Sequence, residues 1–206
     1  MIAIIDYDAG NIKSVEKAVQ FLGEEAIITR DRDVIMDSSG VILPGVGSFG
    51  DAMGKINEYG LKNVIYDVVD SGKPFLGICL GLQLLFKTSE ETPGVTGLGI
   101  VDGQILRIPD VPGLKIPQIG WNSLDINPKA RLFKGLPEHP YVYFVHSYYL
   151  KADHEEDVAA STFYSTNIHA SIEHGNVFAC QFHPEKSSAV GRKILQNFLA
   201  INREDN

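Results

Sequence analysis

Residues 73–86 read KPFLGICLGLQLLF, and this stretch decides the fold. A short apolar run ends at the turn GICLG, in which Cys79 stands between Gly77 and Gly81, and a second apolar run follows at once. A buried strand, a tight turn between glycines and a helix make a nucleophile elbow, here with cysteine in place of serine. Because the turn is strained, small residues must flank the nucleophile. The stretch predicts an α/β fold that presents Cys79 at the carboxyl end of a strand.

Two features of this turn would activate Cys79. The N-terminus of the following helix places partial positive charge near the sulfur, which favours the thiolate. The backbone N–H of Leu80 is expected to be free to bind an oxyanion. The alternative is a buried structural cysteine, which is the commoner fate of a free thiol. The strand before Cys79 and the helix after it favour the nucleophile.

The chain around the elbow alternates between strand and helix patterns. The segments IAIIDY, EAIITR, GVILPG and KPFLGIC predict four buried strands. Helices are predicted from Asn11 as N-cap to Gly23 at the C′ position, over Phe49–Tyr59 and Leu61–Asp70, and directly behind Cys79. This order predicts a doubly wound α/β fold with a mostly parallel central sheet and flanking helices.

Beyond residue 95 the pattern changes to short β-like runs separated by proline and glycine. We expect these runs to form an antiparallel or mixed β extension of the sheet, and a final helix from about Ser188 to Ile201. No repeat or linker interrupts the chain, so we expect one domain over residues 1–206. The predicted strands of the second half are Gly97–Arg107, Gln118–Ile126, Tyr141–Leu150, Ile168–Glu173 and Val177–Phe182.

Among six histidines, His183 is the best candidate for the base that a cysteine nucleophile needs. It follows the apolar run VFACQF, and the strand ends of α/β folds commonly carry catalytic residues. Glu185 stands two residues on, and Pro184 favours the extended geometry in which His183 and Glu185 point the same way. Alone, HPE would be a loop leaving a strand; with the elbow it predicts a triad with Cys79. Cys180 is expected to be a core residue.

A glycine-rich loop follows the third predicted strand in VILPGVGSFG. Gly45, Val46 and Gly47 can bring backbone N–H groups close to a ligand, and Ser48 can cap the next helix. The loop lacks the spacing of a P-loop, and no GxGxxG follows the first strand. No cluster has zinc or calcium spacing, so we expect no metal and no cofactor.

The composition excludes several classes of function. Lys and Arg number 18 against 26 Asp and Glu, a net charge of −8, which argues against a nucleic-acid binder and against an electrostatic membrane anchor. Two cysteines cannot make a disulfide framework. The N-terminus MIAIIDYDAGN lacks the positive region of a signal peptide, and no apolar stretch reaches the length of a membrane span. We therefore expect a cytoplasmic protein.

The motifs GICLGLQLLF and QFHPE resemble those of the class I, or triad, glutamine amidotransferases. Within that family, the segments DYDAGNIKSV, LPGVGSFGDAM, GLGIVDG, IPQIGWN, FVHSYY and FHPEKS most resemble the glutaminase subunits of imidazole glycerol phosphate synthase, in histidine biosynthesis. They run from residue 6 to residue 187, nearly the whole chain. One departure is Asp8, where relatives often carry glycine.

The resemblance implies L-glutamine as the substrate. Cys79 would attack the carboxamide carbon, His183 would take the thiol proton and give one to the departing ammonia, and Glu185 would orient His183. Water would hydrolyse the resulting glutamyl thioester. A backbone flip at Val46 would complete the oxyanion hole, so resting activity should be low. The positions implied to bind substrate or oxyanion are Gly45, Val46, Gly47, Leu80, Gln83, His146, Ser147 and Tyr148.

The resemblance also implies a partner, a (β/α)8-barrel cyclase subunit in a heterodimer. That subunit would use the ammonia to convert the nucleotide PRFAR to imidazole glycerol phosphate and AICAR. The positions that match the subunit interface are Asn11, Trp121, Tyr143 and Lys186. A lone tryptophan is equally a core anchor, and Lys186 equally a surface charge.

Two other functions share these residues. A γ-glutamyl hydrolase or peptidase on the same scaffold would use Cys79 and His183 without a partner. A catalytically silent regulatory subunit would keep the fold alone, but the complete Cys-His-Glu set argues against it.

Overall fold

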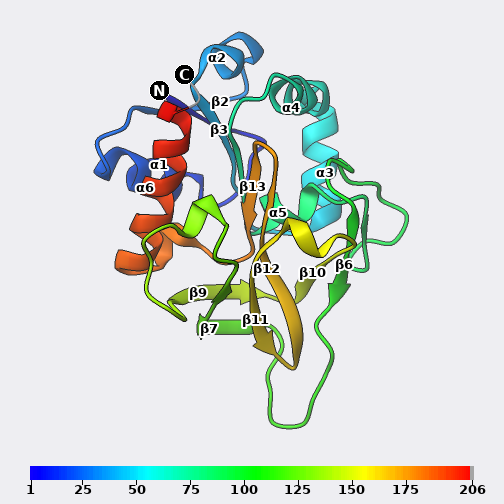
Figure 1. The fold of residues 1–206 in the computed structure, drawn as a ribbon. Coiled ribbons are helices and arrows are strands. Elements are labelled where there is room, and N and C mark those ends of the chain that lie inside the picture. The colour runs from blue at the N-terminus through cyan, green and yellow to red at the C-terminus, as the bar shows by residue number, and fades with distance from the viewer. Residues whose placement is uncertain (205–206) are drawn as a thin grey trace.

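The computed structural model describes residues 1–204, so residues 205–206 of the predicted domain lie outside the described residues. Five parallel strands form the centre of a large sheet, in the order β2-β1-β3-β4-β13 (Figure 1). This confirms the predicted α/β fold with its parallel centre. The strands are β1 (Ile2–Ile5), β2 (Ala26–Thr29), β3 (Gly40–Leu43), β4 (Phe75–Ile78) and β13 (Val177–Cys180).

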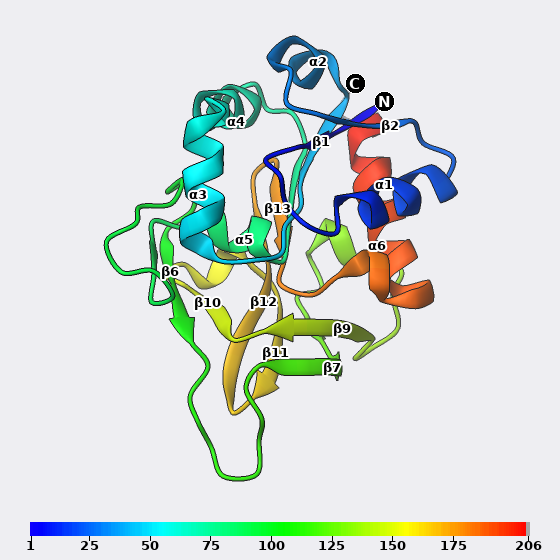
Figure 2. The ribbon, with the colours of Figure 1, turned by 180° about the vertical axis from the view of Figure 1, so that it is seen from behind.

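Helices cover both faces of the parallel centre. Side chains alternate across a strand, so Ile2 and Ile4 of β1 enter one core cluster, whereas Ala3 and Ile5 enter the other. The first cluster is covered by α1 (Ile12–Phe21) and α6 (Ser188–Glu204), and Figure 2 shows these two helices on one side of the sheet. The second is covered by α2 (Arg32–Asp37), α3 (Phe49–Glu58) and α4 (Leu61–Asp70). No helix in residues 1–204 is long and apolar enough to cross a membrane.

The predicted β extension continues the sheet from β13 with mostly antiparallel strands, and a separate two-stranded ribbon lies beside it (Figure 1). The ribbon consists of β7 (Gln118–Ser123) and β9 (Tyr141–His146). The extension consists of β12 (Thr166–His174), β10 (Tyr148–Ala152), β6 (Gly103–Arg107), β5 (Thr88–Ser89), β11 (Val158–Tyr164) and β8 (Asp125–Ile126). Short 3₁₀ turns occupy Arg131–Phe133, Glu155–Asp157 and Pro184–Lys186.

Three of the predicted strand runs were wrong, and other elements were missed. Only Gly103–Arg107 of the run Gly97–Arg107 is a strand, and Gln118–Ile126 forms two strands, β7 and β8. The run Tyr141–Leu150 is two strands, because the chain turns at Ser147 and passes from the ribbon into the main sheet. Only His146 and Ser147 interrupt the apolar and aromatic residues of this run, so the sequence pattern did not reveal the turn. Helix α2 and strand β11 were not predicted. Asp31 caps α2, accepting from the backbone of Asp33 and Val34, but six residues are too few for a helical period to show.

The parallel strands all bring their carboxyl ends to one edge. In the pairing register, Leu43 lies opposite Gly77, and Ile78 lies opposite Cys180. Strand β1 lies between β2 and β3, where the chain order reverses, and ligands of α/β sheets bind at the carboxyl ends beside such a point. The loops that leave β1, β3, β4 and β13 therefore meet at this edge.

Candidate active site

Cys79 occupies the predicted elbow between β4 and α5 (Leu80–Leu84). Its backbone has φ 53° and ψ −107°, a positive-φ conformation that a non-glycine residue adopts only under strain. A Cβ on Gly81 would lie 1.9 Å from the carbonyl oxygen of Leu43, so only glycine fits there. The prediction of a strained turn flanked by small residues is confirmed. The helix is shorter than LGLQLLF suggested, because tighter turns close its end at Leu85 and Phe86.

A glutamine missed by the sequence reasoning lies beside the sulfur. The Gln181 amide donates to Cys79 Sγ at 3.7 Å and accepts from the Gln83 amide at 3.0 Å, while Cys79 Sγ lies 3.9 Å from the Val145 carbonyl oxygen. Gln181 is completely buried. One signal could have found it, since it is the polar residue inside the apolar run VFACQF. Gln83 lies beside the nucleophile as expected.

His183 and Glu185 make the predicted contact. His183 Nδ1 lies 2.8 Å from Glu185 Oε1, and both side chains are buried. Burial alone would lower the pKa of His183, but its hydrogen bonds to Cys79 and Glu185 outweigh burial and raise the pKa to about 9. A protonated His183 at neutral pH is the form that stabilises a thiolate on Cys79. His183 is extended as predicted, whereas Glu185 lies in a 3₁₀ turn.

Glu185 has a second partner. The Asn11 amide donates to Glu185 Oε1 at 2.6 Å, so this one oxygen meets both Asn11 and His183. The other oxygen, Oε2, is buried without a hydrogen-bond partner among the described residues. Asn11 occupies the N-cap position of α1 as predicted, but its backbone is left-handed and its side chain makes no capping hydrogen bond, because it is turned to the triad. Cys180 is core, as expected, and burial raises the pKa of its thiol.

His146 is a second buried histidine at this site. Its Nε2 lies 2.8 Å from the amide oxygen of Gln118, and its Nδ1 lies 2.8 Å from the carbonyl oxygen of Tyr148. Burial lowers its pKa to about 4, so the ring is neutral at pH 7. A neutral ring can donate one N–H to Tyr148 while the Gln118 amide turns its NH₂ group toward the other nitrogen.

The glycine-rich loop after β3 blocks the oxyanion position. The Leu80 N–H donates to the Gly45 carbonyl oxygen at 3.3 Å, so the prediction of a free N–H was wrong for this conformation. A Cβ on Gly45 would lie 2.0 Å from the Tyr7 hydroxyl, so this position too accepts only glycine. Gly47 has φ 120°, which favours glycine, and Ser48 caps α3 as predicted. Rotation of the Gly45–Val46 peptide would free the Leu80 N–H.

A cavity of about 300 Å³ opens beside Cys79. Of the predicted substrate and oxyanion residues, all but Gly45 line it; of the triad, Cys79 and His183 line it and Glu185 does not. Three lining residues, Glu91, Pro117 and Val145, were not predicted. Glu91 also accepts a 2.7 Å hydrogen bond from the N–H of Phe49. The lining residues are Val46, Gly47, Cys79, Leu80, Gln83, Glu91, Pro117, Val145, His146, Ser147, Tyr148, His183 and Lys186.

One residue predicted for a subunit interface lines this cavity, and two lie on the β7–β9 ribbon. Lys186 is exposed and lines it. Trp121 is half exposed on the outer face of the β7–β9 ribbon, where its ring meets that of Tyr143 edge-on at 5.9 Å. Ile119 and Tyr141 are exposed on the same face. Trp121 is therefore not a core anchor. Residues 1–204 contain no group of three or more potential metal ligands.

Comparison with known proteins gives a uniform result. The family model "Glutamine amidotransferase class-I" matches residues 3–201. The subunit HisH of imidazole glycerol phosphate synthase from Methanocaldococcus jannaschii is 46% identical and covers 98% of this chain and 100% of its own. The HisH subunit from Moorella thermoacetica is 48% identical, with 98% of this chain and 95% of its own covered.

Solved structures share the fold. A crystal structure described as a glutamine amidotransferase superposes with a TM-score of 0.77 at 20% identity, covering 98% of this chain and 100% of that chain. The structure of PurLQS from Thermotoga maritima gives a TM-score of 0.76 at 21% identity, with 97% of each chain covered.

Proposed function

The chain belongs to the class I glutamine amidotransferase family and, within it, to the HisH subunits of imidazole glycerol phosphate synthase, and from that premise we propose a residue-level mechanism for its glutaminase reaction. L-Glutamine is hydrolysed to glutamate and ammonia by the triad Cys79, His183 and Glu185. The observation that carries the proposal is the short contact between His183 and a buried carboxylate, beside a cysteine on a strained elbow.

The reaction proceeds in two halves. The thiolate of Cys79 attacks the carboxamide carbon, His183 gives its proton to the leaving amine, and ammonia departs as the glutamyl thioester forms. Water then loses a proton to His183 and attacks the thioester carbon, and the C–S bond breaks to release glutamate. Glu185 keeps its charge throughout and holds the imidazolium in place. In total, one glutamine and one water give one glutamate and one ammonia.

The oxyanion of each tetrahedral intermediate needs two backbone donors. The Leu80 N–H is one, but it is engaged by the Gly45 carbonyl in this conformation. Rotating the Gly45–Val46 peptide would free it and turn the Val46 N–H into the same space, with Gly47 supplying the flexibility. The resting enzyme is therefore slow, and the rotation is the activating step.

The cavity offers groups for both ends of glutamine. Glu91 is its acidic lining residue and suits the α-ammonium group, while Lys186 and the Ser147 hydroxyl suit the α-carboxylate. Gln83, held by the Tyr148 carbonyl at 3.1 Å, faces the side-chain amide. These assignments follow from charge and position in the cavity wall.

The ammonia passes to a (β/α)8-barrel cyclase subunit that binds this chain as a heterodimer in the cytoplasm. The cyclase subunit uses this ammonia to convert PRFAR to imidazole glycerol phosphate and AICAR. The exposed apolar face of the β7–β9 ribbon, with Trp121 and Tyr143, supports this docking because it continues into the cavity through Val145. Asn11 and Lys186 complete the contact.

Replacing the nucleophile tests the reaction. Cys79→Ala should lower glutamate release from glutamine by at least about 10³-fold, measured with and without the barrel subunit and its nucleotide ligand. The matched variant Cys180→Ala removes the other, fully buried thiol and should keep most of the activity. Glutamate release by Cys79→Ala at the wild-type rate would contradict the triad. Strong hydrolysis of γ-glutamyl peptides without a partner would favour a stand-alone hydrolase instead.

A further inference from the structure

The β1–α1 loop, residues 6–11, touches both halves of the candidate site. It leaves the strand at the point where the strand order reverses, next to β3. No step of the glutaminase reaction uses a group of this loop. One end of it contacts the glycine-rich loop after β3, residues 44–47, which we call the oxyanion loop. The other end contacts the triad carboxylate.

Tyr7 and Gly10 contact the oxyanion loop. The buried Tyr7 hydroxyl donates to the Pro44 carbonyl oxygen at 2.7 Å, which fixes the peptide that precedes Gly45. A Cβ on Gly10 would lie 2.6 Å from the Val46 side chain, so the two segments lie in close contact. The peptide that must rotate, Gly45–Val46, thus has its neighbouring peptide held by Tyr7. A held neighbour confines the rotation to that single peptide.

Asn11, at the other end of the loop, contacts the triad carboxylate Glu185. Its amide donates to the Glu185 oxygen that faces His183, at 2.6 Å. Because the second oxygen of Glu185 has no partner among the described residues, Asn11 and His183 alone set the orientation of this carboxylate. A left-handed backbone, φ 67°, aims the Asn11 side chain, and asparagine tolerates that conformation better than most residues.

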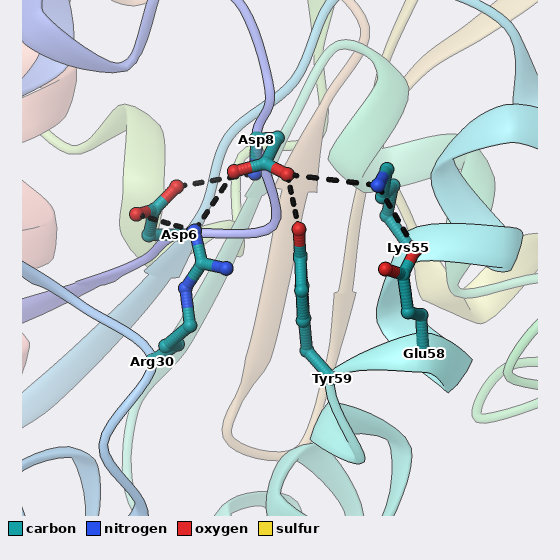
Figure 3. Close-up of polar contacts among 6 residues, drawn as sticks. All are labelled: Asp6, Asp8, Arg30, Lys55, Glu58 and Tyr59. Atoms are coloured by element: carbon teal, nitrogen blue, oxygen red, sulfur yellow. Dashed lines mark hydrogen bonds and ion pairs between the residues drawn. The ribbon is translucent and has the colours of Figure 1, made fainter.

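The middle of the loop is anchored by charge. Figure 3 shows Asp8 between three partners: it accepts from Arg30 at 2.8 Å and from the Tyr59 hydroxyl, and lies 3.8 Å from the Lys55 ammonium. Arg30 also donates to Asp6 at 2.9 Å. These bonds join the loop to the end of β2 and to α3, and a network of several charges holds geometry better than one exposed pair.

We propose that the β1–α1 loop is a positioning element of the active site, in which Asn11 orients the triad carboxylate and Tyr7 fixes the pivot of the oxyanion loop. This proposal rests on the proposed glutaminase function. Neither residue touches the reacting atoms. Each acts through a different group, so their removal should affect different measurements.

The test separates the two halves with a reagent that needs no oxyanion hole. Iodoacetamide alkylates a thiolate directly. Because Cys180 is fully buried, the reagent reacts with Cys79, and the alkylation rate measured against pH follows the ionisation of that residue. Asn11→Asp sets a carboxylate against Glu185, which should raise the midpoint of that profile by about one pH unit and lower kcat about tenfold. Tyr7→Phe should leave the midpoint unchanged and lower kcat for glutamine about fivefold, with KM within about twofold.

Matched controls remove the same groups elsewhere. Tyr66→Phe deletes a hydroxyl that donates to the Leu98 carbonyl oxygen at 2.6 Å, and Asn63→Asp adds a charge on the exposed side of α4. Both should leave kcat and the alkylation profile at wild-type values. Turnover is measured for the chain alone and in complex with the barrel subunit.

Two results would overturn the proposal: unchanged profile and kcat in Asn11→Asp, or a Tyr7→Phe variant that moves the alkylation midpoint as Asn11→Asp does. If wild-type protein alkylates but does not hydrolyse glutamine with its partner, the proposed function fails. The alkylation profile then still decides the role of Asn11.

Discussion

Two corners of the site hold buried histidines whose pKa values move in opposite directions. His183, at the end of β13, has its pKa raised to about 9, and His146, at the end of β9, has its pKa lowered to about 4. Their rings are similarly hidden, 2% and 6% exposed. Burial lowers the pKa of both rings, so burial cannot explain the difference.

The partners of each ring explain it. His183 meets a buried carboxylate and the Cys79 thiol, which favour the imidazolium. His146 meets the amide of Gln118 and a backbone carbonyl, which are neutral and do not offset the desolvation of a charged ring. The positive charge of His183 nearby lowers the pKa of His146 further. One corner is therefore suited to proton transfer, whereas the other is a rigid neutral wall of the cavity.

Removing the charge at the first corner should have the largest effect. Glu185→Gln keeps the shape of the side chain but removes the charge that holds the imidazolium, so the pKa of His183 should fall and kcat should drop about 10³-fold at pH 7. Glutamate release gives kcat, and NMR titration of the ring protons gives the pKa. Glu173→Gln makes the same change at a partly exposed ion pair with Arg131 and should leave both values alone. A normal kcat with a lowered pKa would show that the imidazolium is not required.

The second corner makes a prediction about acid stability. The folded pKa of His146, about 4, lies below the ordinary value of 6.5, so between these values the unfolded chain binds a proton that the folded chain does not. Its stabilising contribution is present above pH 6.5 and is lost as the pH falls toward 4, by about 3 kcal/mol in total.

Urea unfolding at pH 7 and pH 4.5 measures this loss. The free energy of unfolding of His146→Gln should change less between the two pH values than that of the wild type, because the variant lacks the group. Parallel changes in the two proteins would mean that His146 is protonated in the folded state already.

The corners also differ in how far the sequence reveals them. The His183 corner was predictable because the elbow and HPE are local patterns: glycines must flank a strained turn, and two residues' spacing brings Glu185 to His183. The parallel strands were predictable for a similar reason, since continuous apolar runs indicate strands buried on both faces.

What the sequence could not show depends on contacts between distant segments. Asn11 and Glu185 are 174 positions apart, and no local signal pairs them. The bond from the Leu80 N–H to Gly45 depends on the orientation of one peptide, which residue identity does not set in a glycine loop. The burial that lowers the pKa of His146 is equally non-local, since Gln118 reaches the ring only because β7 pairs with β9.

The smallest expected effect comes from giving His146 a carboxylate partner like the one that His183 has. Gln118→Glu places a carboxylate where the amide now lies 2.8 Å from His146 Nε2, within a buried setting like that of Glu185. If partner charge decides the pKa, that of His146 should rise from about 4 by about 1 to 2 units. The new carboxylate is costly to bury at pH 7 while His146 is neutral, and less so once the ring is protonated. The stability gap between variant and wild type should therefore shrink as the pH falls from 7 to 5, and unfolding curves at both values measure it. An unchanged His146 titration would mean that a partner charge does not offset burial at this position, and partner charge would then no longer explain why His183 alone carries the proton.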